Sequence, residues 1–135
     1  MKPAFDDLPN RRTAWEALSD LFLDTDTSLS RPWRVQVLAA TVYTIEELEH
    51  ILIWEVEPVC RWNMLGIAGE WLGFDLDRMQ RRILGRLRRP KWLRYPSFAR
   101  FTIPRDSEWI ATKAEVNSLR SEGLTSKAPE LEDPL

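Results

Sequence analysis

The chain contains one histidine, His50, and one cysteine, Cys60, which are the first pair to weigh as a catalytic dyad. A thiol nucleophile needs a histidine within hydrogen-bond reach and a third group that orients the imidazole. Pro58 lies between the two residues and is expected to interrupt a helix, and a free cysteine is common in protein cores. We therefore predict a protein without catalytic residues. Glu70 and His50 are the first residues to test in the alternative that the protein is an enzyme.

The sequence contains few residues that could form a metal site. A zinc site needs three or four cysteine, histidine or carboxylate ligands. Asp24, Asp26 and Ser28 alternate as in the first half of a calcium loop. Leu29, however, stands where that loop needs glycine, and Val35 stands where it needs glutamate. We therefore predict a polar loop between two helices, and no metal or other cofactor.

Two carboxylates, Glu55 and Glu70, lie inside apolar stretches, where an unpaired charge is costly. The simpler interpretation is that each pairs with a nearby arginine, such as Arg12 or Arg61, or accepts the N–H of a tryptophan. The alternative is a carboxyl group in a cleft with a shifted pKa. The sequence leaves both interpretations open.

Basic residues are concentrated between positions 78 and 105, a segment that holds ten of them and no acid. Residues 1–77 carry fourteen acids against six bases, and residues 106–135 carry seven against three. The whole chain has a net charge of only -2 at pH 7. These oppositely charged parts must therefore neutralise each other in the fold or face different partners.

Three interpretations of the basic segment 78–105 follow. Its arginines can pair internally with the acidic first half, with their stems covering tryptophan rings. The segment can instead neutralise the phosphates and stack the bases of a nucleic acid, although a pI near 5.5 makes this partner less favoured. It can also bind an acidic protein, because arginine and aromatic side chains are enriched in interface cores. The residues predicted to make such contacts are Arg81, Arg82, Arg88, Lys91, Trp92 and Tyr95.

An acidic face is the second candidate surface, formed by carboxylates of the first half of the chain. A basic partner, such as a nuclease or another cationic toxin, would be captured quickly by such a face because opposite charges speed association. The residues predicted to form it are Asp20, Asp24, Asp26, Glu46 and Glu49.

Helical periodicity and capping residues predict the elements that position these side chains. Asn10, Ser30, Thr44 and Asp75 are the expected N-caps, and Thr44 with Glu47 matches a capping box. The predicted helices cover residues 11–23, the stretches after Ser30 and after Thr44, residues 57–72 with a start near Glu57, 75–89 and 106–120. The last two helices are predicted to bury Leu76, Met79, Ile83 and Leu87, and Trp109, Ile110, Val116 and Leu119.

The predicted fold is all-α, a single compact domain of about six short helices over residues 1–120. Residues 90–105, which are rich in proline and aromatic residues, are expected to be extended, with a short strand at 99–103. The acidic tail 121–135 is expected to be flexible. One cysteine excludes an intramolecular disulfide, and neither a secretory signal nor a membrane span is recognisable. We therefore expect a cytoplasmic protein.

Three spaced segments carry a resemblance to a known family. They read RxxxWxxLSxLFLDT at residues 11–25, EVxPVCxxN at 55–63 and GEWxGF at 69–74. In this order they resemble a family of small bacterial proteins of uncharacterised function, over roughly residues 11–84. The resemblance implies a small helical bacterial domain and implies no activity, partner or site.

Small size, an acidic face and many aromatic residues favour a function in binding. We expect an immunity-type protein that neutralises a cognate bacterial toxin by binding it and occluding its active site. The alternative is a nucleic-acid-binding or regulatory module that uses the basic segment 78–105.

Overall fold

A computed structural model describes the backbone of residues 1–22, 26–64, 75–90 and 106–132, and the side chains of 1–22, 26–60, 75–90 and 107–123. The fold is all-α, as predicted, and the described residues contain no strand. The predicted strand at 99–103 lies outside them. The helices are α1 (Leu8–Ser19), α2 (Arg31–Ala40), α3 (Ile45–Ile51), α4 (Glu57–Met64), α5 (Leu76–Leu87) and α7 (Asp106–Glu132). Shorter elements are the 3-10 turns η1 (Ala4–Asp6) and η2 (Asp20–Phe22) and the π-helix η3 (Leu52–Val56).

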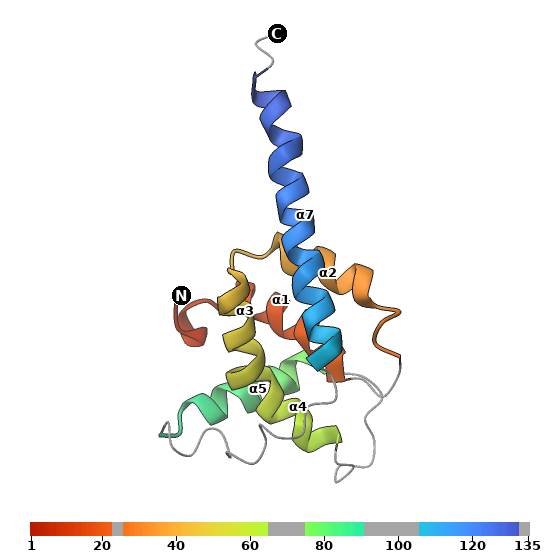
Figure 1. Ribbon diagram of the computed structural model, residues 1–135. Coiled ribbons are helices and arrows are strands. Elements are labelled where there is room, and N and C mark those ends of the chain that lie inside the picture. Colours follow the sequence, from red (N-terminus) through yellow and green to blue (C-terminus); the bar gives the residue numbers. More distant parts are fainter. Residues whose placement is uncertain (23–25, 65–74, 91–105, 133–135) are drawn as a thin grey trace.

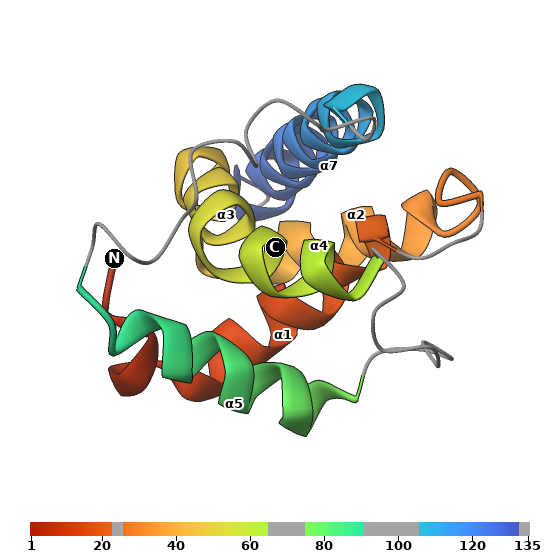
Figure 2. The same ribbon diagram turned by 90° about the horizontal axis from the view of Figure 1, so that it is seen from below.

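Helix α1 lies at the centre of the arrangement and contacts α2, α3, η3 and α5 (Figures 1 and 2). Elements α3, η3 and α4 follow one another without a break, and α7 packs along α2. The core between them contains Trp15, Leu18, Phe22, Leu38 and Leu48, all fully buried. No helix among the described residues has the length and apolar character that crossing a membrane requires.

The predicted helix starts are confirmed at Thr44 and Asp75. The Thr44 side chain accepts the backbone N–H of Glu47, and the Glu47 side chain accepts the backbone N–H of Thr44, which completes the capping box. Asn10, in contrast, is not an N-cap. Helix α1 begins at Leu8 because Pro9, which has no N–H to leave unpaired, fits within the first helical turn. Asp7 takes the N-cap position and accepts a hydrogen bond from Asn10 at 2.9 Å.

Ser30 precedes α2 as predicted, but its hydroxyl does not cap the helix. It donates instead to the carboxylate of Asp20. Helix α4 begins at Glu57 as predicted, but Pro58 does not interrupt the helical path, because η3 leads directly into α4. The wide π-turn η3 ahead of it relieves the clash that the proline ring makes with a carbonyl four residues earlier.

The inner face of α7 differs from the predicted one. Trp109 and Val116 are buried as predicted, but Ile110 is 60% exposed and Leu119 is 37% exposed. Thr112, which is fully buried, completes the inner face. The prediction missed this because it assigned the inner face from apolar residues alone.

Arg120, also on α7, donates to the carbonyls of Leu38, Ala39, Thr41 and Tyr43 at 2.7–3.3 Å. A guanidinium there satisfies the last carbonyls of α2 and interacts favourably with the C-terminal end of its dipole. A predominantly polar part of α7 thus holds α2 in place.

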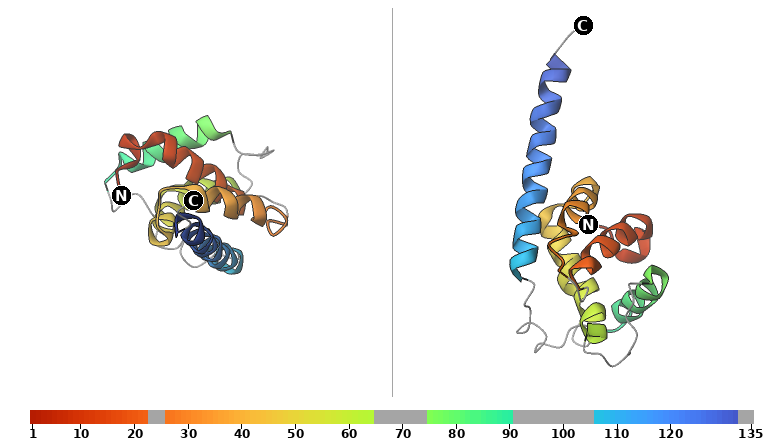
Figure 3. Two further views of the ribbon diagram at one scale, coloured as in Figure 1. Left: turned by 90° about the horizontal axis from the view of Figure 1, so that it is seen from above. Right: turned by 90° about the vertical axis from the view of Figure 1, so that its right-hand side faces the viewer.

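Helix α7 continues to Glu132, past the predicted end near Arg120. Extending an existing helix adds residues without a new nucleation step, so weak helix formers can follow a well-anchored start. The second half of the helix projects away from the other elements (Figures 1 and 3).

A buried arginine joins α2, η2 and α7. Arg34 is completely buried and donates to Asp20 at 2.7 Å, Glu108 at 2.6 Å and Thr112 at 3.2 Å. Arg31 also donates to Glu108, at 2.6 and 2.8 Å, from a more exposed position. Because a charge removed from water needs close partners, this cluster fixes how α7 lies on α2.

Replacement of Arg34 by alanine is expected to lower the free energy of unfolding by about 3–5 kcal/mol, because two carboxylates lose their buried counter-charge. Urea denaturation of the purified protein measures the change. Arg31→Ala is the matched control, since it removes a guanidinium from the same Glu108 at the surface and is expected to cost much less. Equal losses in the two variants would contradict the assignment of Arg34 as the anchor.

Acidification is expected to loosen α7. The hydrogen bond from Arg31 holds the pKa of Glu108 below its ordinary value, and those from Trp109 and Lys113 do the same for Glu49. A carboxyl group with a depressed folded-state pKa contributes stability that is present above its ordinary pKa of 4.5 and is lost as the pH falls through the folded value.

Thermal unfolding measured between pH 7 and pH 3 checks this expectation. The melting temperature should fall below about pH 4.5, and it should fall less steeply in Glu108→Gln, which has no carboxyl group to titrate at that position. Identical pH profiles for both proteins would rule out a contribution from Glu108.

Candidate binding surface

Helix α5 begins at a strong cap and packs through one face. The Asp75 carboxylate accepts the backbone N–H of Asp77 at 3.1 Å and of Arg78 at 3.3 Å. Met79 and Ile83 are buried in the core, as predicted, and the predicted Leu76 and Leu87 are partly buried against it. Helix α5 contacts α1, α4 and η3, so its orientation is fixed from three sides.

The opposite face of α5 and its C-terminal end carry five exposed arginines, which we term the arginine face. They are Arg78, Arg81, Arg82, Arg88 and Arg89. The only acid within α5, Asp77, pairs with Arg12 of α1 at 2.9 Å. Arg78 and Arg81 form no ion pair with any described side chain. Several carboxylates in the first half of the chain pair with arginines of that same half. Ion pairs within the protein therefore do not account for the whole arginine face.

Arg88 adds an aromatic component to this face. Its guanidinium lies over the ring of Phe5, 5.4 Å from the ring centre, and the Phe5 side chain is 42% exposed. The N-terminal turn η1 therefore contributes an aromatic ring beside a basic helix.

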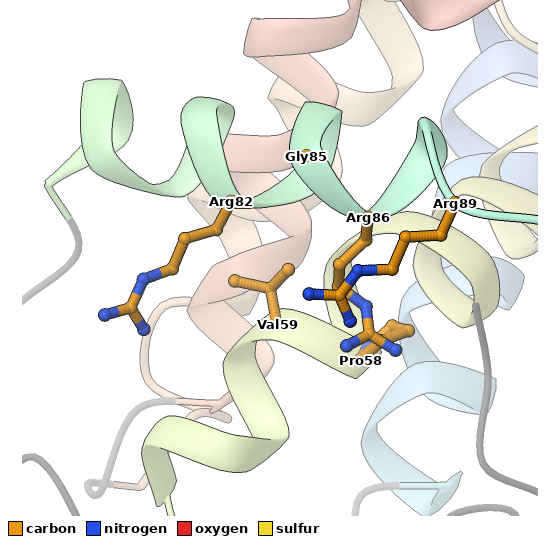
Figure 4. A pocket seen from close by; sticks show the side chains of 6 residues that line it. All are labelled: Pro58, Val59, Arg82, Gly85, Arg86 and Arg89. Carbon is orange, nitrogen blue, oxygen red and sulfur yellow. The ribbon is translucent and has the colours of Figure 1, made fainter. Parts of the chain in front are cut away.

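A pocket opens where α5 faces α4 (Figure 4). It has a volume of about 330 Å³. Its lining residues, which we term the arginine pocket, are Pro58, Val59, Arg82, Gly85, Arg86 and Arg89. Arg82, Gly85 and Arg86 belong to α5, and Arg89 follows two residues after its end. The spacing i, i+3 and i+4 places the first three on one side of the helix.

The arginines of this pocket are arranged unequally. Figure 4 shows the guanidiniums of Arg86 and Arg89 close together above Pro58, while Arg82 extends to the other side of Val59. Burial, followed by the nearby charge of Arg89, lowers the pKa of Arg86 from its ordinary value. Both causes disfavour the charged form of Arg86.

A buried ion pair precedes Pro58 and Val59 by about one helical turn. Glu55 of η3 accepts two hydrogen bonds from Arg11, at 2.9 and 3.0 Å, and one from the indole of Trp15 at 2.8 Å. Arg11 and Glu55 are 2% and 4% exposed. The bidentate pair joins α1 to η3 and so positions Pro58 and Val59 at the start of α4.

Glu55 follows the simpler of the two interpretations of the sequence, since it has both an arginine and a tryptophan N–H as donors. The arginine is Arg11, however, and not Arg12, which lies on another side of α1 and donates to Gln80 and Asp77. Glu70 lies outside the described residues.

The histidine and the cysteine do not form a dyad. His50 is exposed on α3, with its ring centre 6.1 Å from that of Trp54. Cys60 is buried on α4, with its sulfur 3.9 Å from that of Met79. Ten residues of a continuous helical path separate the two Cα atoms by about 15 Å. Within the described part of the chain, no group of three or more histidine, cysteine, aspartate or glutamate side chains is arranged to hold a metal ion.

Two carboxylates of the predicted acidic face make contacts within the chain. Asp20 is buried against Arg34, and Glu49 accepts hydrogen bonds from Trp109 and Lys113. Asp20 is therefore not part of an exposed acidic face, whereas the Glu49 side chain remains 41% exposed. Asp26 is exposed but accepts from Ser28, Glu46 is exposed, and Asp24 lies outside the described residues.

Three of the predicted basic residues lie close together on the surface. Arg81, Arg82 and Arg88 are brought together on one exposed side of α5 and its end. Lys91, Trp92 and Tyr95 lie outside the described residues. The sequence analysis did not single out Arg86 and Gly85, although their spacing from Arg82 and Arg89 was a usable signal. No signal in the sequence pointed to Pro58 and Val59, because their approach depends on how α4 packs.

The Glu55 contacts are expected to control the local stability of the pocket floor. Glu55→Gln leaves Arg11 buried beside a neutral amide, so backbone amides of η3 and α4 should exchange with deuterium at least about tenfold faster. Hydrogen exchange followed by mass spectrometry measures this rate. Asp77→Asn, which removes the charge from the exposed pair with Arg12, is the control. If both variants exchange alike, the pair does not stabilise the floor.

Comparison with known proteins assigns the chain to a family. No curated protein and no solved structure matches it significantly. A family model described as a domain of unknown function, DUF7079, matches residues 9–121, which extends well past the part that carried the resemblance in the sequence. The match includes α1 to α5, the arginine pocket and the first part of α7. The chain therefore belongs to the DUF7079 family.

Proposed function

We propose that this protein acts by binding another protein, as an immunity-type protein that neutralises a cognate bacterial toxin in the cytoplasm. The observation that carries the proposal is the arginine face of α5, held rigidly by the buried residues Met79 and Ile83. A pre-ordered helix face loses little conformational freedom on binding, which favours affinity.

The composition of this face suits an acidic protein partner. Arginine and aromatic side chains are the groups that most often dominate binding energy at interfaces. Arg88 above the half-exposed ring of Phe5 combines both in one place. Planar guanidiniums also recognise carboxylates in a bidentate manner, which gives specificity as well as affinity.

The arginines of α5 could block an active site that contains carboxylates. Glycosidases use paired carboxylates as acid, base or nucleophile, and metal-dependent nucleases depend on metal sites to which carboxylates are suited. A rigid helix that presents arginines can pair with such carboxylates and exclude the substrate. The proposed partner is therefore a toxin with an acidic catalytic cleft, in place of the basic toxin that the sequence suggested.

Nucleic acid is the second candidate partner, and the row of arginine charges along α5 favours it. Arg78 and Arg88, the C-cap residue of α5, are separated by about 15 Å along the helix, a length over which a basic stripe can follow several phosphates. The aromatic residues that would stack on bases, Trp92 and Tyr95, lie outside the described residues, so this candidate rests on charge alone.

Charge reversal tests the proposed surface. The double variant Arg81→Glu and Arg88→Glu is expected to lose the protection of cells that co-express a toxin encoded beside the native gene, because like charges then face the acidic cleft. Glu46→Lys with Asp26→Lys is the matched control, since it changes two exposed acids elsewhere and should keep protection. Both double variants should retain the circular dichroism of the wild type.

The identity of the partner is tested separately. A tagged protein is recovered from the native host, treated with nuclease and washed at low and then high salt. One protein retained in a fixed ratio supports the proposal. Material that disappears with nuclease, or binding with a steep salt dependence that Arg81→Glu and Arg88→Glu abolish, would replace it with the nucleic-acid candidate.

A further inference from the structure

We propose that a groove between α2 and α7 docks a basic amphipathic helix of a partner protein. The groove has a volume of about 320 Å³, and we term it the α2–α7 groove. It lies on the other side of the molecule from α5 (Figures 2 and 3). The inference goes beyond the proposed function, since it concerns a different surface and a partner of opposite charge. The groove is lined by Pro32, Val35, Gln36, Glu115, Ser118, Leu119 and Glu122.

Three apolar side chains line this groove. Val35 of α2 is buried, whereas Pro32 of α2 and Leu119 of α7 are exposed. Single exposed apolar residues are ordinary on a protein surface, but these three border one hollow. Apolar surface that is rimmed by polar residues is typical of a binding site. Leu119, which the sequence assigned to the core, is therefore placed where a partner can reach it.

The rim that α7 contributes is acidic. Glu115 and Glu122 are both exposed and lie on either side of Leu119 along the helix. Glu115 reaches one cation, Arg31 of α2, at 3.9 Å. Glu122 forms no ion pair with any side chain that the structure describes. Opposite charge selects partners and speeds their association, so this rim favours a basic occupant.

The chain itself shows how a guanidinium pairs with this side of α7. Glu108, Glu115 and Glu122 follow one another at intervals of seven residues, which keeps them near one side of the helix. Arg31 binds the first of them with two hydrogen bonds, at 2.6 and 2.8 Å, and approaches the second. Basic side chains of a partner would continue this pairing at Glu115 and Glu122.

The groove is formed before any partner arrives. Arg34 joins α2 to Glu108 and Thr112 near the start of α7. Arg120 of α7 holds the other end of α2 through the carbonyls of its last residues. These contacts fix both ends of α2 against α7. A preformed surface loses little conformational freedom on binding, which favours affinity.

A helix is the shape that this groove fits. The lining residues of α7 have the spacing i, i+3, i+4 and i+7, and those of α2 have the spacing i, i+3 and i+4. Two packed helices with such ridges can accept the apolar stripe of a third helix between them. Glu115 and Glu122 are about 10.5 Å apart along the axis, which two basic residues seven positions apart on a docked helix would match.

A second copy of this chain does not supply such a helix. Its basic helix is α5, and the buried side of α5 carries Met79 and Ile83 in the core of its own molecule. Helix α5 therefore offers charge without an exposed apolar stripe. The occupant that fits both the apolar lining and the acidic rim is a helix of another protein.

Titration of the full chain with a synthetic peptide tests the proposal. The probe is a fluorescently labelled, helix-forming peptide of leucine and lysine, about 18 residues long. Its leucines form one stripe, and its lysines flank that stripe at intervals of seven residues. Fluorescence anisotropy measures its binding, and saturable binding of one peptide per protein is expected. Absence of saturable binding would overturn the proposal.

Variants of the protein locate the bound peptide. Glu115→Gln with Glu122→Gln is expected to weaken binding at least about tenfold, because the rim loses its charge. Leu119→Gln keeps the charge and is expected to weaken binding at least about fivefold. Glu16→Gln with Glu46→Gln is the matched control, since it removes two exposed carboxylates outside the groove and should keep affinity within about twofold.

Equal weakening by the two double variants would show that net charge alone attracts the peptide, and this result would contradict the proposal. An unchanged affinity in Leu119→Gln would do the same for the apolar lining. All variants should retain the circular dichroism of the wild type, because the changed side chains are exposed.

Two further peptides separate charge from shape. One replaces the lysines by glutamine, and the other keeps the lysines but replaces the leucines by serine. Both are expected to bind at least about tenfold more weakly than the probe. If the serine peptide binds as tightly, the groove takes any polycation. If the glutamine peptide does so, charge does not select the partner. Either outcome would overturn the assignment to a basic amphipathic helix.

Sedimentation of the protein alone tests the other occupant. A monomer is expected at the concentrations used in the titration. A dimer that Leu119→Gln dissociates would place a second copy in the groove, contrary to the proposal.

The neutral variant Arg81→Gln with Arg88→Gln separates this inference from the proposed function. It changes only α5 and its C-cap, so it should bind the basic peptide as the wild type does, even if charge reversal at the same positions abolishes the protection of cells. Failure of one proposal would therefore not imply failure of the other.

Discussion

The desolvation of two guanidinium groups, those of Arg11 and Arg34, is the constraint on which the arrangement of helices depends. Each is almost completely removed from water, and each is held by carboxylates from elsewhere in the chain. Arg11 joins α1 to η3 through Glu55, and Arg34 joins α2 to η2 and α7 through Asp20 and Glu108. A buried charge tolerates little displacement of its partners, so these contacts select one way of packing the helices.

This use of charge also determines what the surface offers. Several acids of the first half are consumed by the internal arginines or by Lys113. Helix α5 contributes one acid, which pairs with α1, and exposes a series of arginines. A chain of nearly neutral net charge thus presents a strongly basic helix. Its surface charge is decided by which residues the fold buries, and overall composition conceals it.

Local features of the fold were predictable from the sequence, and long-range partners were not. Thr44 and Asp75 were identifiable as caps because their donors and acceptors lie within one helical turn. The stripe of Met79 and Ile83 followed from periodicity alone. The partner of Glu55 could not be predicted from periodicity. Neighbouring arginines on α1 point about 100° apart, and only tertiary packing decides which one turns inward. Thr112 and Arg120 were missed on α7 because polar residues there take over contacts that an apolar pattern would assign to Ile110 and Leu119.

The candidate surface was likewise predictable only in its local features. The exposed arginines of α5 could be identified from composition, while the pocket required the approach of α4. That approach depends in turn on the π-helix η3, which contains one residue more per turn than an α-helix. The additional residue changes the phase of everything that follows it by about 100°. One helical path can therefore direct Glu55 toward Arg11 and Trp15 and, a turn later, direct Val59 toward α5. A single additional residue thus lets two buried side chains of consecutive turns face different neighbours.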